Sequence, residues 1–230
     1  MSYFYHPDLS LGAEFALCDE ESRHMTKTLR MKAGTVIDVL DGKGGVAKAE
    51  LLSVPERRGQ ATARVLEFKT VLKPKTRVHL YVCPPRNNLL TQIIRQSTEL
   101  GVASIQLMES EYTMSRPKDK NLAEWERAAL AACKQSGNAF LPEFPSVKSF
   151  SAALAACELP SYYGAVPEDA DKLNRADDSP EDLAIWIGPE GGFSAAELAA
   201  LKESGAKGIC LGTWILRVET AVVAMMSQFV

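Results

Sequence analysis

From residue 3 to about residue 72, hydrophobic and polar positions alternate in short runs that turn residues interrupt. Residues 35–40 and 46–51 alternate in this way on either side of the glycine-rich segment 41–45, which predicts a β-hairpin. A further strand is expected within residues 60–69. Short strands joined by tight turns favour a small β-barrel in this part of the chain.

The alternation stops at residues 73–75, where a proline lies between two lysines. We expect a domain boundary at this point, because the pattern beyond it changes to strands that alternate with long helices. The sequence therefore predicts two domains, a β-barrel over residues 1–72 and a larger α/β domain over residues 73–230.

Helical and strand periods alternate in the second region. Apolar residues recur at helical spacing between positions 89 and 100 and stop at Gly101, a residue type that often ends helices. The alanine-rich segment 122–136 is a second predicted helix. The predicted strands are 77–83, 104–108, 183–187 and 208–212. This alternation indicates a parallel α/β sheet.

Residues 158–182 interrupt the alternation with a strongly acidic stretch. Eight acids stand here against one lysine and one arginine. They are Glu158, Glu168, Asp169, Asp171, Asp177, Asp178, Glu181 and Asp182. We expect most of this stretch to be a solvated loop.

Composition narrows the class of protein. The 230 residues are 46% hydrophobic and 24% charged, which is typical of a folded chain. The formal net charge of −3 means that any nucleic-acid site must be a local basic patch. Five scattered cysteines without a C-x-x-C pair indicate neither a disulfide framework nor a metal site, so a cytoplasmic protein is expected. No apolar run approaches the roughly 20 residues that span a bilayer, and no membrane association is expected.

The glycine-rich segment 187–192 follows a predicted strand, and its sequence is Ile-Gly-Pro-Glu-Gly-Gly. Ser194, with Glu197 three residues later, forms a capping box that predicts the start of a helix. Glycines here expose backbone N–H and C=O groups at the carboxyl edge of a parallel sheet, where α/β proteins bind ligands. A tight turn without a ligand is the alternative interpretation of this segment taken alone.

A second glycine-terminated strand, residues 208–212, precedes the last predicted helix. Two such loops at neighbouring strand ends can enclose one small planar ligand. Arg217 and Glu219 stand just before this helix, either as a local ion pair or as charges presented to a substrate. The helix itself is rich in Val, Ala and Met and is expected to form core or a dimer interface.

One basic patch stands out in the first region. Residues 22–32 hold four Lys or Arg and no acid. In a helix, Arg23, Lys27 and Arg30 would share one face, which either contacts phosphates or is simply solvated. The three histidines lack neighbours at metal-ligand spacing and are expected to be structural or to lie at the surface.

The two C-terminal segments together resemble a known signature. The residues are Ile187-Gly188-Pro189-Glu190-Gly191-Gly192, then Leu211-Gly212, Ile215-Leu216-Arg217 and Glu219-Thr220-Ala221. They resemble the RsmE family of SPOUT methyltransferases, which methylates N3 of a uridine in 16S ribosomal RNA. Supporting segments are His24 with Leu29-Arg30, Asp41-Gly42, Glu99-Leu100-Gly101-Val102 and Gln135-Ser136-Gly137 with Pro142. The resemblance covers essentially the whole chain.

This resemblance implies a fold and partners that periodicity alone does not suggest. The expected fold class is α/β, with an N-terminal PUA-like β-barrel that binds RNA and a C-terminal SPOUT domain. The final segment, about residues 183–230, is expected to form a deep trefoil knot. The implied cofactor is S-adenosyl-L-methionine, and the implied partners are 16S ribosomal RNA or the small ribosomal subunit. A homodimer with active sites at the subunit interface is also implied.

The resemblance also implies roles for particular residues. The expected cofactor-binding residues are Ile187, Gly188, Pro189, Glu190, Gly191, Gly192, Leu211, Gly212, Ile215, Leu216 and Thr220. The expected RNA-binding residues are Arg23, His24, Lys27 and Arg30. Because N3 of uracil carries a proton, a base is needed, and Glu219 and Glu190 are the nearest carboxylates by motif position. Arg217 would stabilise negative charge that develops on the uracil carbonyl oxygens.

Four positions depart from the family pattern. Leu89, Gln96, Tyr112 and Asn138 stand where the family usually has a cation. Because fewer cations are available to contact phosphates, the affinity for RNA should be lower and should depend less steeply on salt concentration. Two alternatives therefore remain: a non-catalytic RNA-binding protein that keeps the fold, and a SPOUT enzyme that acts on another RNA nucleoside.

Overall fold

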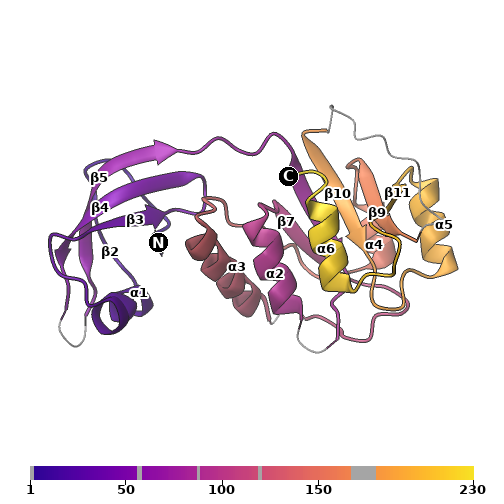
Figure 1. Cartoon of the computed structure of the whole chain (residues 1–230), viewed down its shortest axis with the longest axis horizontal. Helices are drawn as coiled ribbons and strands as arrows, with labels where there is room; N and C mark the ends of the chain where they lie inside the picture. The colour runs from indigo at the N-terminus through magenta and orange to yellow at the C-terminus, as the bar shows by residue number, and fades with distance from the viewer. Residues whose placement is uncertain (1–2, 56–58, 87–88, 119–120, 167–179) are drawn as a thin grey trace. The chain divides into compact units, whose positions relative to one another are not determined.

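The computed structural model of the chain describes residues 3–55, 59–86, 89–118, 121–166 and 180–230. The chain forms two compact units, and Figure 1 labels helices and strands of both. Unit 1 comprises Met1–Lys73 and Leu130–Leu141, and unit 2 comprises Pro74–Ala129 and Pro142–Val230.

Unit 1 is built on one curled five-stranded sheet. Its elements are β1 (Phe4–Tyr5), β2 (Glu14–Ala16), α1 (Asp19–Arg23), the π-helix η1 (His24–Leu29), β3 (Val36–Leu40), β4 (Gly45–Ser53) and β5 (Thr62–Thr70). The strand order is β1-β3-β4-β5-β2, and the antiparallel pairing of β3 with β4 confirms the predicted hairpin. Within the described part of the chain no pairing joins the short edge strands β1 and β2, so the small β-barrel that the sequence predicts is an open half-barrel.

The inner face of this sheet and the helical segment that follows β2 form the core of unit 1. Leu17, Val39 and Ala49 are completely buried, and Met25 of η1 joins the same cluster. The segment after α3 also belongs to this unit, because Gly44 N donates to Ala139 O and Leu141 N donates to Gly42 O, each at 2.9 Å. The hairpin turn is thereby held by a second stretch of chain.

Unit 2 is a parallel sheet, as the sequence predicts, and helices lie on both of its faces. Its elements are β6 (Arg77–Val82), α2 (Leu90–Glu99), β7 (Ser104–Glu109), α3 (Leu122–Ser136), β8 (Lys148–Ser149), α4 (Phe150–Ala155), β9 (Ser161–Ala165), β10 (Asp182–Ile187), α5 (Ala195–Glu203), β11 (Lys207–Cys210) and α6 (Val218–Met226). Only the first part of α3 belongs to this unit. The strand order is β11-β9-β10-β6-β7-β8, and every pairing is parallel.

The acidic stretch at 158–182, where the sequence predicts mostly a solvated loop, also contains one strand. Residues 161–165 form β9, which lies between β10 and β11. The acids stand on either side of the sequence Ser-Tyr-Tyr-Gly-Ala and none stands inside it, so Tyr163 can be buried. Residues 167–179 lie outside the described residues.

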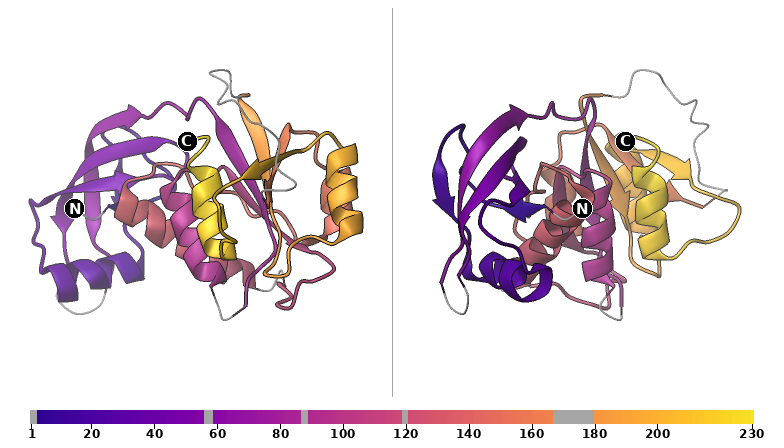
Figure 2. Two further views of the ribbon diagram at one scale, coloured as in Figure 1. Left: turned by 45° about the vertical axis from the view of Figure 1, so that its right-hand side comes forward. Right: turned by 60° about the vertical axis from the view of Figure 1, so that its left-hand side comes forward.

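Two helical layers cover the sheet of unit 2. Trp186 and Tyr163 belong to one cluster with Phe150 of α4 and Leu201 of α5. On the opposite face, α6 packs against α2 and β10, and the left view of Figure 2 shows these two helices on one side of the sheet and α5 on the other. None of the described helices is both long and apolar enough to cross a bilayer.

Candidate functional site

The carboxyl ends of the parallel strands bring two glycine-containing loops together. A Cβ placed on Gly164, near the end of β9, would lie 3.4 Å from Ile187 Cδ1 and 3.9 Å from Leu211 Cδ1. Ile187 is the last residue of β10, and Leu211 directly follows β11. The loops after β10 and β11 therefore begin on either side of one glycine, at the sheet edge where α/β proteins bind ligands.

The loop after β10 is a tight turn over residues 188–192, here called the glycine turn. Gly192 N donates to Pro189 O at 2.8 Å, and Gly192 has a φ of +72°, which favours glycine. A Cβ on Gly188 would lie 3.2 Å from both Gly192 C and Phe193 N, so the turn folds back closely onto this position and leaves little room for a side chain. Gly191 and Gly192 are exposed, which leaves their backbone groups accessible.

Two carboxylates fix this turn to neighbouring loops. The predicted capping box is confirmed: Glu197 N donates to Ser194 Oγ at 3.3 Å, and Glu197 Oε2 accepts from Ser194 N at 2.9 Å. Glu197 Oε1 accepts in addition from Glu111 N, at 2.9 Å, in the loop after β7. Glu190 Oε1 accepts from Arg86 N, at 2.7 Å, in the loop after β6.

The loop between β11 and α6, residues 211–217, is largely exposed and is here called the second loop. Leu211 and Leu216 are half-buried, whereas Gly212 is exposed and Ile215 is 89% exposed. Trp214 beside it is 82% exposed. Thr220 lies in the first turn of α6 and is exposed. The predicted cofactor residues thus lie at the end of β10, in the loops after β10 and β11, and in the first turn of α6, and Ile215 contributes little to the packing of unit 2.

Arg217 and Glu219 stand at the start of α6. Arg217 is the exposed N-cap residue, and Glu219 lies half-buried in the first helical turn, where the helix dipole favours a carboxylate. Over the described ranges neither side chain has an ion-pair or hydrogen-bond partner. The alternative of a local ion pair is therefore wrong for this structure, and both charges remain available.

The basic patch of unit 1 is arranged differently from the predicted single helical face. The chain is α-helical only to Arg23, continues as the π-helix η1 to Leu29, and turns at Arg30 with a left-handed φ of 52°. This turn places Arg30 after the end of the helix, so the expectation that it shares a face with Arg23 and Lys27 is wrong.

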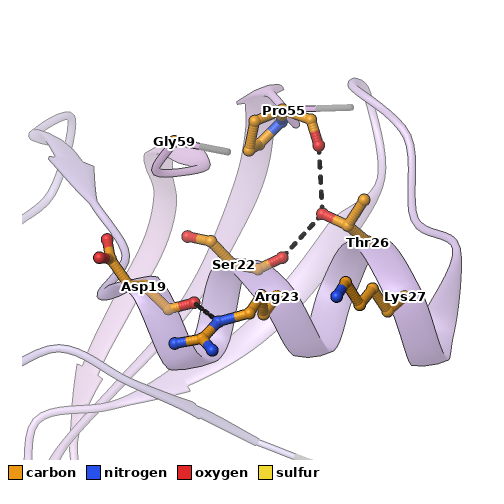
Figure 3. A pocket seen from close by; sticks show the side chains of 7 residues that line it. All are labelled: Asp19, Ser22, Arg23, Thr26, Lys27, Pro55 and Gly59. Carbon is orange, nitrogen blue, oxygen red and sulfur yellow. Dashed lines mark hydrogen bonds between the residues drawn. The ribbon is translucent and has the colours of Figure 1, made fainter. Parts of the chain in front are cut away.

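Arg23 and Lys27 line a cavity of about 390 Å³ (Figure 3). Its lining residues are Asp19, Ser22, Arg23, Thr26, Lys27, Pro55 and Gly59. Thr26 Oγ1 donates to Ser22 O at 2.8 Å and to Pro55 O at 3.2 Å, which fixes one wall. His24 and Arg30 are exposed and are not among the lining residues.

The four departures from the family pattern have different environments. Leu89 precedes α2 as its N-cap residue, and Gln96 is half-buried within that helix. Asn138 Oδ1 accepts from Phe140 N at 3.0 Å, so this residue shapes the turn after α3. Tyr112 is 46% exposed and lies against Gly191 of the glycine turn.

Sequence reasoning missed the contacts of Arg86, Glu111 and Tyr112 with the glycine turn and its helix. The first two contacts use backbone N–H groups, which every non-proline residue carries, so no residue type marks them in a sequence. Among the described residues no group of His, Cys, Asp and Glu is placed to hold a metal ion.

Comparison with known proteins identifies the class to which this fold and site belong. A family model described as an RNA methyltransferase domain matches residues 72–230, and one described as an RNA methyltransferase PUA domain matches residues 17–63. The chain therefore belongs to the RNA methyltransferase family.

Individual relatives show which RNA methyltransferases the chain resembles. It is 32% identical over 171 residues to the ribosomal RNA small subunit methyltransferase E of Aquifex aeolicus, covering 71% of this chain and 72% of that protein. The protein of the same name from Bacillus subtilis is 28% identical over 229 residues, covering 93% of this chain and 88% of that one. The resemblance to the RsmE family is thereby confirmed.

A solved structure agrees with the architecture. The crystal structure of a ribosomal RNA small subunit methyltransferase E from Neisseria gonorrhoeae, bound to S-adenosyl methionine, superposes with a TM-score of 0.89 at 29% identity. The superposition covers 99% of this chain and 95% of that one.

Proposed function

We propose that this chain transfers a methyl group from S-adenosyl-L-methionine to N3 of a uridine in the 16S ribosomal RNA of the small subunit. The observation that carries the proposal is the glycine turn, which lies at the carboxyl edge of the sheet beside the start of the second loop. Family membership supports it, because the similar protein from Neisseria gonorrhoeae binds S-adenosyl methionine.

The residues present fit this cofactor. Gly188 leaves little room for a Cβ, and the exposed Gly191 and Gly192 have no side chains of their own that would cover their backbone groups. The residues that would hold the cofactor are Ile187, Gly188, Pro189, Glu190, Gly191, Gly192, Leu211, Gly212, Ile215, Leu216 and Thr220. When bound, the cofactor supplies an electrophilic methyl group. The chain's own contribution is to bind it, orient it and prepare the uracil.

Glu219 is the proposed general base. Uracil N3 is a poor nucleophile until its proton is removed, and a carboxylate oxygen of Glu219 would accept that proton. Arg217, two residues earlier and exposed, would stabilise the negative charge that then spreads onto the uracil carbonyl oxygens. Glu190 is the less suitable base, because its Oε1 already accepts from Arg86 N. We assign it the role of positioning the glycine turn.

We further propose that the domain over residues 1–72 is the PUA-like RNA-binding part and that residues 73–230 form the methyltransferase part. Arg23 Nε donates to the backbone oxygen of Asp19, and over the described ranges neither Arg23 nor Lys27 has an ion-pair partner. Their charges therefore remain available for phosphates. His24 and Arg30, both exposed, would extend the contact.

A trefoil knot over about residues 183–230 and a homodimer complete the proposal. The topology supports the knot, because β10 lies between β6 and β9, and the chain crosses to β11 before α6 returns to α2 and β10. The exposed Trp214 and Ile215 support a subunit interface next to the second loop, where a partner would cover them.

Two measurements on the full chain test the proposed function. Isothermal titration should show saturable binding of S-adenosyl-L-methionine, and the chain should transfer a labelled methyl group to small ribosomal subunits that lack the modification. Nucleoside mass spectrometry should then show N3-methyluridine. Binding of RNA without cofactor binding would instead identify a non-catalytic RNA-binding protein, and a different methylated nucleoside would identify another target.

The Gly188→Ala variant connects this function to the glycine turn. Its Cβ would meet the backbone at 3.2 Å, so we expect cofactor affinity to fall at least about tenfold as the turn shifts. Gly205→Ala is the matched control, because Gly205 has a φ of +86° with nothing within 4 Å of its Cβ position. It should lower stability by about 1 kcal/mol without changing cofactor affinity. Unchanged affinity in Gly188→Ala would remove the glycine turn from the site.

A further inference from the structure

Tyr112 lies beside the glycine turn although it is distant in sequence. It follows β7, and because β7 and β10 are parallel members of one sheet, both of their following loops emerge at the same edge. A Cβ placed on Gly191 would lie 3.2 Å from the Cβ of Tyr112 and 3.5 Å from its Cδ2. The Cβ and the near edge of the Tyr112 ring therefore pack on the exposed Gly191.

The backbone on both sides of Tyr112 is fixed. Thr113 N donates to Ser110 O at 3.1 Å, and Ser110 N donates to Thr113 Oγ1 at 2.9 Å, which closes the turn. Glu111 N donates to Glu197 Oε1, and the other oxygen of this carboxylate caps α5. Tyr112 is therefore carried by a turn that is tied to the helix following the glycine turn, so binding a ligand there costs little backbone ordering.

Within the part of the chain that the structure describes, no polar or aromatic partner accounts for the position of the ring. It is 46% exposed, and among the described residues no hydrogen bond involves its hydroxyl and no other ring stacks on it. One side of the side chain contacts Gly191, while the rest is open to solvent. The surface that this residue offers is flat, apolar and uncharged.

The sheet order separates Tyr112 from the space between the two proposed cofactor loops. In the order β11-β9-β10-β6-β7, the second loop follows β11 on one side of β10, and Tyr112 follows β7 on the other side. A ligand that stacks on Tyr112 therefore approaches the glycine turn from the side away from the second loop. That side suits the substrate better than the cofactor, which would lie between the two loops.

We infer that Tyr112 is a stacking platform for one nucleobase of the substrate RNA, next to the site of methyl transfer. Single-stranded RNA is recognised largely by stacking of bases on aromatic side chains, and an unpaired uridine is required because pairing occupies N3. This inference rests on the proposed function, since it takes the glycine turn as the cofactor site. Tyr112 would bind and orient RNA without charge.

Steady-state methylation of unmodified small ribosomal subunits, with cofactor affinity measured separately by titration, tests the inference. Tyr112→Ala should raise the KM for the subunits about 5- to 100-fold and leave the dissociation constant of S-adenosyl-L-methionine unchanged within about twofold. Tyr112→Phe, which keeps the ring, should retain the wild-type KM, whereas Tyr112→Leu, which keeps only apolar bulk, should behave like Tyr112→Ala. The salt dependence of RNA binding should not change, because no cation is removed.

Met114→Ala is the matched control, because Met114 is exposed in the same loop. We expect this variant to keep the KM within about twofold of wild type. Full activity in Tyr112→Leu would contradict the inference that the Tyr112 ring stacks on a nucleobase. A loss of cofactor affinity in Tyr112→Ala, in place of a raised KM, would contradict it as well. An equal loss in Met114→Ala would overturn it as well, because the effect would not depend on the ring. A wild-type chain that neither binds the cofactor nor methylates subunits would refute the proposed function, which is a different result.

Discussion

Glu190 and Glu219 are both carboxylates in the motif, but their surroundings separate them. Glu190 is held through Oε1 by Arg86 N, whereas Glu219 lies half-buried in the first turn of α6 with no partner among the described residues. A general base needs a free lone pair near its substrate, and a carboxylate that is already engaged is better suited to holding a loop. The two residues should therefore respond differently to the same substitution.

We expect Glu219→Gln to lower kcat about 100-fold or more while the dissociation constant of the cofactor stays within about twofold, because the amide cannot accept the N3 proton. Glu190→Gln keeps an acceptor for Arg86 N and should lower kcat by less than about tenfold. Rates measured at saturating cofactor, together with titration of both variants, check this. Full turnover by Glu219→Gln would exclude Glu219 as the base.

For single residues, the sequence predicts some contacts of the site and not others. The capping box was predictable because Ser194 and Glu197 are three residues apart and the rule is local. The second contact of Glu197, to Glu111 N, joins positions 86 residues apart and uses a backbone group. The packing of Tyr112 on Gly191 depends likewise on which strands are neighbours, and residue spacing does not reveal this.

At the scale of elements, β10 is held at both ends. The glycine turn follows its carboxyl end, and Asp182 at its amino end accepts from His79 Nε2 at 2.9 Å and from Arg77 Nη2 at 2.5 Å. His79 Nδ1 in turn lies 2.7 Å from Ser104 Oγ of β7. One polar cluster thus connects β10, β6 and β7 opposite the proposed cofactor site.

Asp182 should make the stability of the protein depend on pH. The hydrogen bond from Arg77, supported by His79, lowers the pKa of Asp182 below its ordinary value of 3.8. A lowered pKa in the folded state means that this stabilisation is complete above the unfolded value, near 4, and is lost as the pH falls through the folded pKa. Asp182→Asn should therefore lower the free energy of unfolding at pH 7 by about 1 to 2 kcal/mol, with a smaller loss at acid pH.

Urea unfolding between about pH 2.5 and pH 7 measures this difference. Glu99→Gln removes the same charge from an exposed residue of unit 2 and should leave both the stability and its pH dependence nearly unchanged. A constant difference between wild type and Asp182→Asn across the whole range would contradict the assigned role of Asp182.

Elements with a long or clear period were predictable, and short or irregular ones were not. The predicted range 122–136 coincides with α3, and the predicted hairpin coincides with β3 and β4. In contrast, β9 has five residues and stands in an acidic stretch, so composition concealed it. The π-helix η1 is wound differently from an α-helix, and this winding and the turn at Arg30 are not visible in a hydrophobic pattern.

The whole molecule carries a formal net charge of −3, although its proposed partner is a polyanion. RNA binding must therefore depend on local cations, and Arg23 and Lys27 beside the cavity in unit 1 are the proposed ones. The variant with Arg23→Ala and Lys27→Ala should weaken binding to 16S ribosomal RNA. The slope of log affinity against log salt should become shallower by about 1.4, because each single-strand phosphate neutralised by a cation contributes roughly 0.7 to it.

Fluorescence anisotropy at several salt concentrations measures this slope. Lys207→Ala changes the charge at an exposed position in unit 2 and serves as the control, with an expected slope close to wild type. If the double variant weakens binding but keeps the wild-type slope, Arg23 and Lys27 do not contact phosphates.

The strand order of unit 2 also has a consequence for synthesis on the ribosome. β7 pairs with β6, which precedes it in the chain, and with β8, whereas both partners of β9 among the described strands, β10 and β11, follow it in the chain. A nascent chain that has emerged only as far as residue 181 thus has no sheet partner for β9 and leaves one edge of β6 open. Folding of this half of the sheet must therefore wait until residues 182–210, which contain β10 and β11, have left the exit tunnel.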